Sequence, residues 1–177
     1  FSWSFNSHTQ RSAYGANRYD AEQKVAFGQL TWDKKTGPHD WLAGAVFRYT
    51  WYDDNTTATV DTLHATNDPE QTPLPGVFLQ DEIALNSRNK LLLGARWDYH
   101  RVHKHIFTPR IAWKYSPASN DVIRVNAGTG FRVVNLFTEE HAALTGARAV
   151  EVSEALKPER SYNVNINYVK KIYPSAF

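Results

Sequence analysis

The sequence lacks cysteine, methionine and any long hydrophobic run. Without cysteine there is no disulfide framework and no thiolate chemistry, which suits either a reducing compartment or a bacterial envelope protein without disulfide bridges. The sequence shows no initiator methionine, no basic n-region and no apolar h-region, so we expect it to be a mature or internal part of a protein. The longest apolar run, Trp41–Phe47, is far shorter than the roughly 18 residues of a membrane helix, so the sequence predicts no helical span.

Motifs for nucleic-acid binding and for catalysis are also missing. The net charge is +2 and no basic stretch accompanies a phosphate-binding motif, so we expect no nucleic acid partner. Gly128-Thr129-Gly130 is a lone GxG inside a predicted strand, not a phosphate-binding loop that begins a helix. There is no nucleophile elbow and no HExxH zinc motif. The sequence therefore predicts no enzyme, no cofactor and no metal site.

Aromatic residues, by contrast, are abundant, and they fall into alternating patterns. They make up 14% of the chain and include six tryptophans. In Val122–Val133 the odd positions are mostly apolar and the even positions are polar or glycine, and the segment SYNVNINYV repeats this alternation. Such a period of two predicts strands with one apolar and one wet face. An apolar face with aromatic edges, opposite a hydrated face, is typical of a transmembrane β-barrel.

The same alternation assigns individual side chains to two sides of a barrel. We expect nine apolar or aromatic residues to face lipid, namely Trp41, Phe47, Trp51, Leu93, Trp97, Ile111, Trp113, Val125 and Ile166. We expect eight polar residues to face the lumen, namely Arg48, Arg96, Asp98, Arg124, Asn126, Arg132, Asn163 and Asn165.

The lengths of the connections favour a membrane barrel over a soluble β-sandwich. Apart from a brief connection at 101–105, long and short predicted connections alternate, as they do between the extracellular loops and periplasmic turns of outer-membrane barrels. The long ones are 7–20, 53–75 and 134–160, and the short ones are 33–39, 86–89 and 116–121. The fold class predicted is all-β, an antiparallel transmembrane barrel segment of about eight strands.

Several details of this pattern are irregular. In Glu22–Trp32 the apolar residues change face midway, which predicts a β-bulge. The segment Asp53–Pro75 shows no periodic element. Asp81 falls on an apolar face without explanation, and Pro109 is expected at a strand end or bulge because it cannot donate to the ladder.

Five phrases resemble the barrel of TonB-dependent outer-membrane receptors, most closely those of the Bacteroidetes type: GVFLQDEIAL, LLLGARWDYH, FTPRIAWKYSP, GTGFRVVNLF and LKPERSYNVNINYV. The resemblance covers residues 76–170 well and the first 75 loosely. It implies a barrel of about 22 strands with an N-terminal plug, which imports a nutrient such as a siderophore, cobalamin or haem with energy from the TonB complex. No plug and no TonB box is found in residues 1–177, which we assign to part of the barrel domain. The implied partners are outer-membrane lipid, the TonB complex through the missing segment, and a small-molecule ligand.

Two regions hold the candidate ligand-binding residues. In HRVHKH, His100, His103 and His105 offer imidazole nitrogens beside an expected extracellular loop, although their spacing matches no closed metal site. The loop Val134–Pro158 combines apolar and charged residues, and we expect part of it to fold back over the barrel mouth. Haem receptors of the family carry sequence phrases around a ligating histidine that are altered here around His141. The candidates in or next to this loop are Arg132, Glu139, Glu140, His141 and Arg148.

Two other functions remain open at this point. One is a small self-contained outer-membrane barrel of eight strands with an adhesin or structural role, since Phe177 resembles the C-terminal aromatic residue of such proteins. Against it, the last residues do not alternate as a closing strand does. The other is a soluble β-sandwich that binds a ligand. The favoured function is that of a receptor-transporter in the bacterial outer membrane.

Overall fold

A single curved antiparallel sheet forms almost the whole structure, which is a computed structural model describing residues 1–14, 17–56, 59–61, 63–133 and 157–172. Among these residues no helix is long and apolar enough to cross a membrane. The sheet contains eight strands, which follow one another in chain order apart from a small hairpin, β4–β5. The strands are β1 (Ser2–Tyr14), β2 (Asn17–Thr36), β3 (His39–Asp54), β4 (Val60–Asp61), β5 (Thr66–Asn67), β6 (Glu70–Ala84), β7 (Asn89–His100), β8 (Lys104–Tyr115), β9 (Asp121–Arg132) and β10 (Glu159–Lys170).

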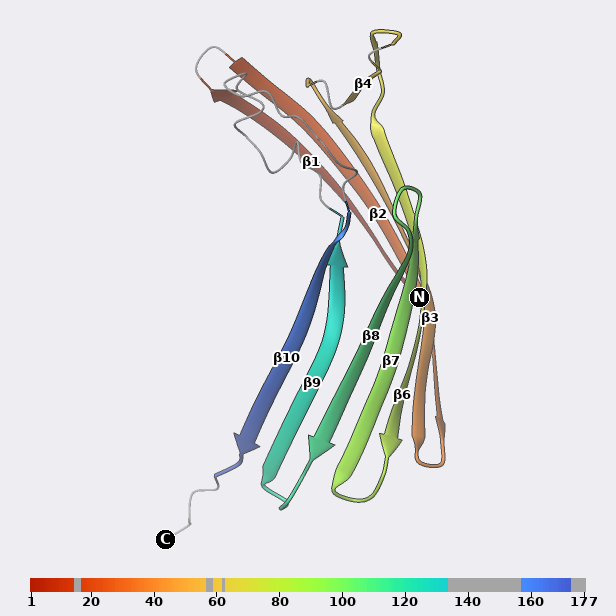
Figure 1. The fold of residues 1–177 in the computed structure, drawn as a ribbon, viewed down its shortest axis with the longest axis vertical. Helices are drawn as coiled ribbons and strands as arrows, with labels where there is room; N and C mark the ends of the chain where they lie inside the picture. Colours follow the sequence, from red (N-terminus) through yellow and green to blue (C-terminus); the bar gives the residue numbers. More distant parts are fainter. Residues whose placement is uncertain (15–16, 57–58, 62, 134–156, 173–177) are drawn as a thin grey trace.

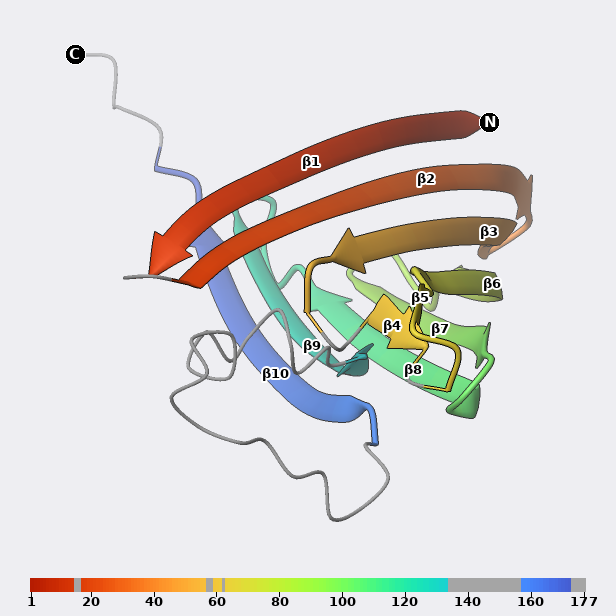
Figure 2. The same cartoon turned by 90° about the horizontal axis from the view of Figure 1, so that it is seen from above.

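The sheet curls into an open arc with β1 and β10 at its two edges (Figures 1 and 2). One end of the arc carries the short connections 37–38, 85–88 and 116–120, and we call it the turn end. At the opposite end, which we call the loop end, β1, β3, β7 and β9 finish and β2, β6, β8 and β10 begin. The β2–β3 turn is the tightest of the turn end, and Gly37 adopts a φ of 58° there, which glycine tolerates without the steric cost of a side chain.

β1, β2, β3 and β6 extend beyond β7 to β10 at the loop end (Figure 1). The predicted loop at 7–20 is therefore wrong, because β1 continues to Tyr14 and β2 begins at Asn17. The segment between Asp53 and Pro75 is also more ordered than expected, since β3 reaches Asp54, β6 begins at Glu70, and β4 pairs with β5 between them. Polar residues on both faces of a strand give no alternation, so these extensions carried no strand signal in the sequence.

No bulge interrupts β2, contrary to expectation. Its register with β1 and with β3 runs without a skipped residue. Val25 and Phe27 therefore lie on one face of the sheet, while Leu30 and Trp32 lie on the other. The apolar residues of β2 therefore change from one face to the other while the backbone stays regular. Each face of the strand meets an apolar environment along part of its length.

Pro109 lies inside β8, not at its end, and is opposite Ala95 of β7. The pairing of β8 with β9, however, runs only from Arg110 to Tyr115. Beyond Pro109 the two strands diverge toward the loop end (Figure 1). The missing N–H of proline thus coincides with the point where one ladder of β8 stops.

Candidate functional site

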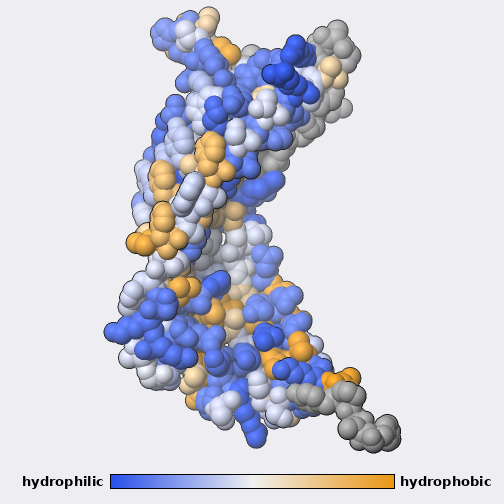
Figure 3. All heavy atoms as spheres, turned by 180° about the vertical axis from the view of Figure 1, so that it is seen from behind, coloured by the Kyte–Doolittle hydropathy of each residue, from blue (hydrophilic) through white to orange (hydrophobic). Residues whose placement is uncertain are grey.

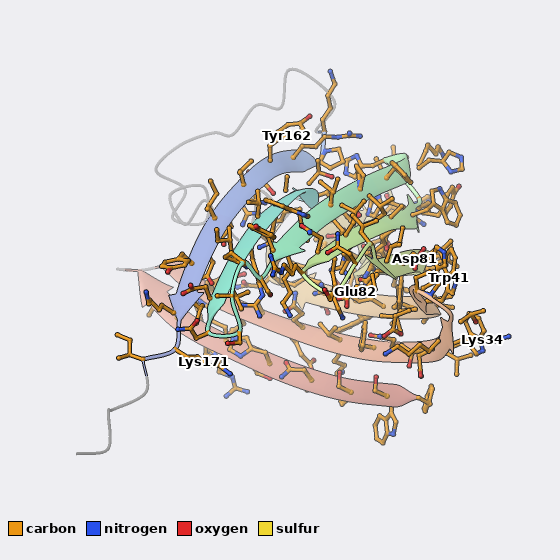
Figure 4. The ribbon with its side chains drawn as sticks, turned by 90° about the horizontal axis from the view of Figure 1, so that it is seen from below. Lys34, Trp41, Asp81, Glu82, Tyr162 and Lys171 are labelled. Carbon is orange, nitrogen blue, oxygen red and sulfur yellow. The ribbon has the colours of Figure 1, made fainter. Side chains whose placement is uncertain are left out.

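The two faces of the sheet differ sharply in polarity, as the alternation predicts. Cross-strand partners lie on the same face, so the registers connect each face across all eight strands. All nine residues expected to face lipid share one face and all eight expected to face the lumen share the other. Trp41 of the first face points away from the hollow of the arc, and Glu82 of the second points into it (Figure 4). The first face is therefore convex and the second concave.

Most large hydrophobic side chains that are exposed lie on the convex face, between the loop end and the turn end. Seen from behind, hydrophobic residues gather between hydrophilic ends (Figure 3). On β3, Trp41 and Trp51 bracket Ala43 and Ala45. At about 3.3 Å per residue and a tilt of about 40°, these tryptophans are separated by about 25 Å along the barrel axis, the height of the lipid-facing band of outer-membrane barrels.

Asp81, which the sequence left unexplained, has a partner on the convex face. Its Oδ2 lies 2.7 Å from Nδ1 of His39, and the ring of His39 stacks on Trp41 with 5.6 Å between centroids. Trp41 is directly opposite Asp81 in the register. Aromatic cover and a hydrogen bond from a neighbouring strand thus accommodate a carboxylate in an apolar surface near the turn end.

The concave face has an apolar part on β2, β3, β6 and β7. Its inward side chains there include Val25 and Phe27 of β2 and Phe78 of β6, which lies across Gly44 of β3. A Cβ at position 44 would lie 2.4 Å from the ring of Phe78, so glycine makes room for the aromatic ring. The apolar residues of this part are Val25, Phe27, Leu42, Val46, Leu74, Phe78 and Leu92.

The concave face contains an ion pair whose acid, Asp98, is fully buried and whose base, Arg96, is partly exposed. The side chain of Asp98 is 0% exposed, and Arg96 donates to it through Nη2 at 2.6 Å and through Nε at 2.8 Å. Gly76 is directly opposite Asp98, and a Cβ there would lie 2.4 Å from its Oδ1. The glycine therefore creates the space in which the carboxylate lies. Two charge-assisted hydrogen bonds compensate the loss of water around the buried acid.

A hydrogen-bond network fixes the base of the 55–69 connection at the loop end. The hydroxyls of Tyr19 and Tyr52 are 2.7 Å apart, and Tyr52 donates to Oδ2 of Asp54 at 2.7 Å. Oγ1 of Thr59 donates to the backbone oxygen of Asp54 at 2.7 Å and accepts from its amide at 3.2 Å. Burial, and then the bond to Asp54, raise the pKa of Tyr52 well above its ordinary value, so this hydroxyl remains a donor.

The three predicted histidines do not converge on one site, because His100 contacts His103 whereas His105 lies on the other face. His100 is on the concave face and 5% exposed, its Nδ1 accepts from the amides of Val102 and His103, and its ring stacks on His103 at 4.7 Å. Burial lowers the pKa of His100. His105 lies on the convex face, where it accepts a hydrogen bond from Trp97 at 3.2 Å. Throughout the described ranges, no three histidine, aspartate or glutamate side chains are placed to hold a metal ion.

Arg132 forms an ion pair at the loop end, where its Nε lies 3.0 Å from Oε2 of Glu159. Both side chains are more than half exposed, so the pair contributes little to stability. The remaining candidates, Glu139, Glu140, His141 and Arg148, lie outside the described residues, as does most of the Val134–Pro158 loop.

Two features of the loop end were not predicted from the sequence. One is the Tyr19–Tyr52–Asp54–Thr59 network, whose members share no motif and meet through strand pairing. The other is a polar groove of about 400 Å³ between the extended strands and the 55–69 connection. It is lined by Arg11 and Arg18, by the acids Asp20, Glu22 and Asp53, and by asparagines. The extension of β1 to β3, which the sequence hid, creates this groove.

Comparison with known proteins agrees with this geometry. The family model described as TonB dependent receptor-like, beta-barrel, matches residues 1–176. No curated protein matches the chain. The siderophore receptor PirA from Pseudomonas aeruginosa is similar in structure, with a TM-score of 0.67 and 13% identity over 97% of this chain and 36% of that chain.

Two further solved structures are similar over smaller parts. A mutant of the ferric enterobactin receptor PfeA from Pseudomonas aeruginosa has a TM-score of 0.54 and 15% identity, over 68% of this chain and 18% of that chain. The ferric citrate transporter FecA has a TM-score of 0.52 and 11% identity, over 94% of this chain and 28% of that chain.

The chain thus spans 36% or less of the length of these three structures. At such low identities they establish the fold, whose barrel is left open by these eight strands. The family itself follows from the match across nearly the whole chain. The chain belongs to the family of TonB-dependent receptor β-barrels.

Proposed function

We propose that the chain is part of an outer-membrane receptor that imports a scarce nutrient with energy from the TonB complex. The observation that carries the proposal is the family match over residues 1–176. The sheet supports it, because a convex apolar face with aromatic edges suits lipid and a concave face with charged and amide side chains suits a hydrated lumen. The remaining strands of a barrel of about 22, the plug and the segment that contacts TonB belong to the rest of the parent protein.

The proposed ligand is a small chelate of iron. The similar solved structures are named for a siderophore, for ferric enterobactin and for ferric citrate. Cobalamin and haem are the alternative ligands. The concave face supports an anionic ligand over a neutral one, because several of its cations have no acidic partner within the described ranges.

Uptake by cells tests the proposal. The full-length receptor is produced in a bacterial strain that lacks its own iron-chelate receptors, with and without a functional TonB protein. Radioactive iron is supplied as ferric citrate and as ferric enterobactin, with radiolabelled cobalamin and haem iron in parallel. We expect uptake of an iron chelate that requires both the receptor and TonB. Uptake that persists without TonB, or no uptake of any of these compounds, contradicts the proposal.

A further inference from the structure

The polar groove of about 400 Å³ at the loop end lies on the outer wall of the sheet. Its charged lining comes mainly from two rows across the extended strands, which are Thr9, Glu22 and Asp53 in one row and Arg11 and Asp20 in the other. Trp51 lies two residues before Asp53 on β3, so both rows share the convex face with this tryptophan. The groove therefore lies on the convex side of the sheet, away from its hollow.

The depth of the groove matches the headgroup layer of a membrane. Trp51 marks the edge of the apolar band that is nearest the loop end. At about 3.3 Å per residue and a tilt of about 40°, the row of Asp53 lies about 5 Å beyond Trp51 and the row of Asp20 about 10 Å beyond it. The headgroups of a bilayer occupy about 5–8 Å on each side of the hydrocarbon core. A lipid next to the convex face therefore places its headgroup beside the groove.

Internal contacts occupy most of the charged groups of the groove. The pairs are Arg18 with Asp20 at 2.7 Å, Asn67 with Asp53 at 3.0 Å and Lys24 with Glu22 at 3.0 Å. Asp54 accepts hydrogen bonds from Tyr52 and Thr59. The binding capacity of the groove depends on the charged atoms that these contacts leave over.

One cation and two carboxylate oxygens are left over. Arg11 is exposed and forms no ion pair with any residue that the structure describes. Oδ1 of Asp20 and Oδ1 of Asp53 are buried and receive no hydrogen bond within the described ranges. A carboxylate oxygen removed from water is costly unless a donor reaches it. The groove thus lacks one anion beside Arg11 and a donor beside the two acids.

A ligand with both charges fits this groove better than a metal ion or a simple anion. In the part of the chain that the structure describes, no three acidic or histidine side chains are placed to hold a metal ion. The lining contains two arginines and four carboxylates, so a phosphate alone would meet an excess of negative charge. Phosphoethanolamine joins a phosphate to an ammonium group, and these complement the two kinds of charged atom left over.

We propose that the groove binds the phosphoethanolamine group of a lipid in the leaflet at the loop end. The inference rests on the proposed function, which places the chain in the outer membrane with this end outside. The phosphate contacts the guanidinium group of Arg11, and the ammonium group donates to Oδ1 of Asp20 or Asp53. The group belongs either to a glycolipid of the outer leaflet or to a glycerophospholipid.

Lipid binding by the purified full-length receptor tests the proposal. Native mass spectrometry in detergent measures binding of lipid A with and without a phosphoethanolamine group, and of phosphatidylethanolamine, phosphatidylcholine and phosphatidylglycerol. We expect the lipids with phosphoethanolamine to bind more tightly, because choline has no N–H donor and glycerol has no cation. Lipid A and phosphatidylethanolamine distinguish the two sources of the group. Equal binding with and without phosphoethanolamine overturns the proposal.

Two variants locate the binding site in the groove. Arg11→Gln removes the partner of the phosphate and Asp53→Asn removes a charge that attracts the ammonium group, so each is expected to weaken binding of the preferred lipid about tenfold. Lys34→Gln is the matched control, because Lys34 is an exposed cation of the convex face, opposite Trp41 near the turn end (Figure 4). A change of electrophoretic mobility on heating shows that each barrel is folded.

Two results with the variants overturn the proposal. One is an equal loss of binding in Lys34→Gln, which would mean that any cation of the convex face holds the lipid. The other is unchanged binding in both Arg11→Gln and Asp53→Asn. Lipid binding is measured without transport, so a receptor that binds the lipid but imports no chelate contradicts the proposed function alone.

Discussion

Single residues decide the local geometry of the concave face, and Gly76 is the clearest case. Because its missing Cβ leaves room for Asp98, Gly76→Ala is expected to displace a buried carboxylate held by Arg96. Overpacking of this kind lowers the free energy of unfolding by about 1–3 kcal/mol. The measurement is the urea concentration at the unfolding midpoint of the full-length receptor, which is expected to decrease. Gly28→Ala is the control, since nothing lies within 4 Å of its added Cβ. Equal midpoints for the two variants contradict the packing described.

The assignment of faces makes a prediction for two consecutive residues of β9. Ala127 lies on the convex face between Ile111 and Val164, and Asn126 lies on the concave face beside Asn165. Ala127→Arg is expected to cost about 2–4 kcal/mol of stability in a bilayer, because it exposes a charge to lipid. Asn126→Arg should have little effect, since its side chain reaches water. Refolding into lipid vesicles from urea measures the stability of both variants. Equal losses of stability would contradict the assignment of the two residues to opposite faces.

Protonation of His100 provides a pH prediction. Burial lowers its folded pKa below the unfolded value of about 6.5, so the unfolded turn binds protons more readily. The stability of the turn is complete above pH 6.5 or so and is lost as the pH falls toward the folded pKa. Trypsin cleavage after Arg101, normalised to an unfolded peptide, should therefore increase at acidic pH. His100→Asn keeps an acceptor for the two amides and should remove this pH dependence.

At the scale of elements, the extended strands β2 and β3 hold the 55–69 connection. Thr59→Val removes two hydrogen bonds to the backbone of Asp54 and buries an unpaired amide, at a cost of about 1–3 kcal/mol of local stability. We expect faster proteolysis between 55 and 69 with the barrel intact. Thr66→Val, at an exposed position of β5, is the control. Equal protease sensitivity of the two variants would show that the network does not anchor the connection.

The convex and concave faces also act as elements, because each collects side chains from all eight strands. Alternation within one strand assigns a residue to a face, but the register determines its neighbours. His39 and Asp81 illustrate this, since they lie on different strands and form the pair that accommodates an acid in the convex apolar surface. The apolar and cationic parts of the concave face likewise become visible only when the strands are aligned.

For the whole molecule, the open edges of β1 and β10 lead to a prediction. The two edge strands do not pair with each other, and unpaired backbone groups are not tolerated in a bilayer. Residues 1–177 refolded alone in detergent are therefore expected to associate through these edges or remain unfolded. Electrophoretic mobility with and without boiling, together with size-exclusion chromatography, measures the outcome. A monomeric species whose mobility changes on heating would favour the small self-contained barrel.

The sequence by itself determined the membrane-spanning strands, their faces and their resemblance to a receptor family. This succeeded because side chains of a strand alternate locally, and lipid on one side with water on the other makes the alternation visible. The prediction of strands was wrong between residues 7 and 20 and near Asp53. Both faces of the extended strands are polar there, so no period of two distinguishes a strand from a loop. The bulge predicted in β2 is absent, because Val25 and Phe27 belong to the apolar part of the concave face.

Only the tertiary structure decided which residues meet across strands. Gly76 accommodates Asp98 and Arg110 crosses Gly94 because the hairpin registers place these distant positions directly opposite each other. The hydroxyls of Tyr19 and Tyr52 meet diagonally across β2 and β3. The histidines of HRVHKH separate onto two faces for the same reason, although they are close in sequence. Register follows from the length of the turn and from the apolar pattern of both paired strands, so the pattern of one strand alone does not give it.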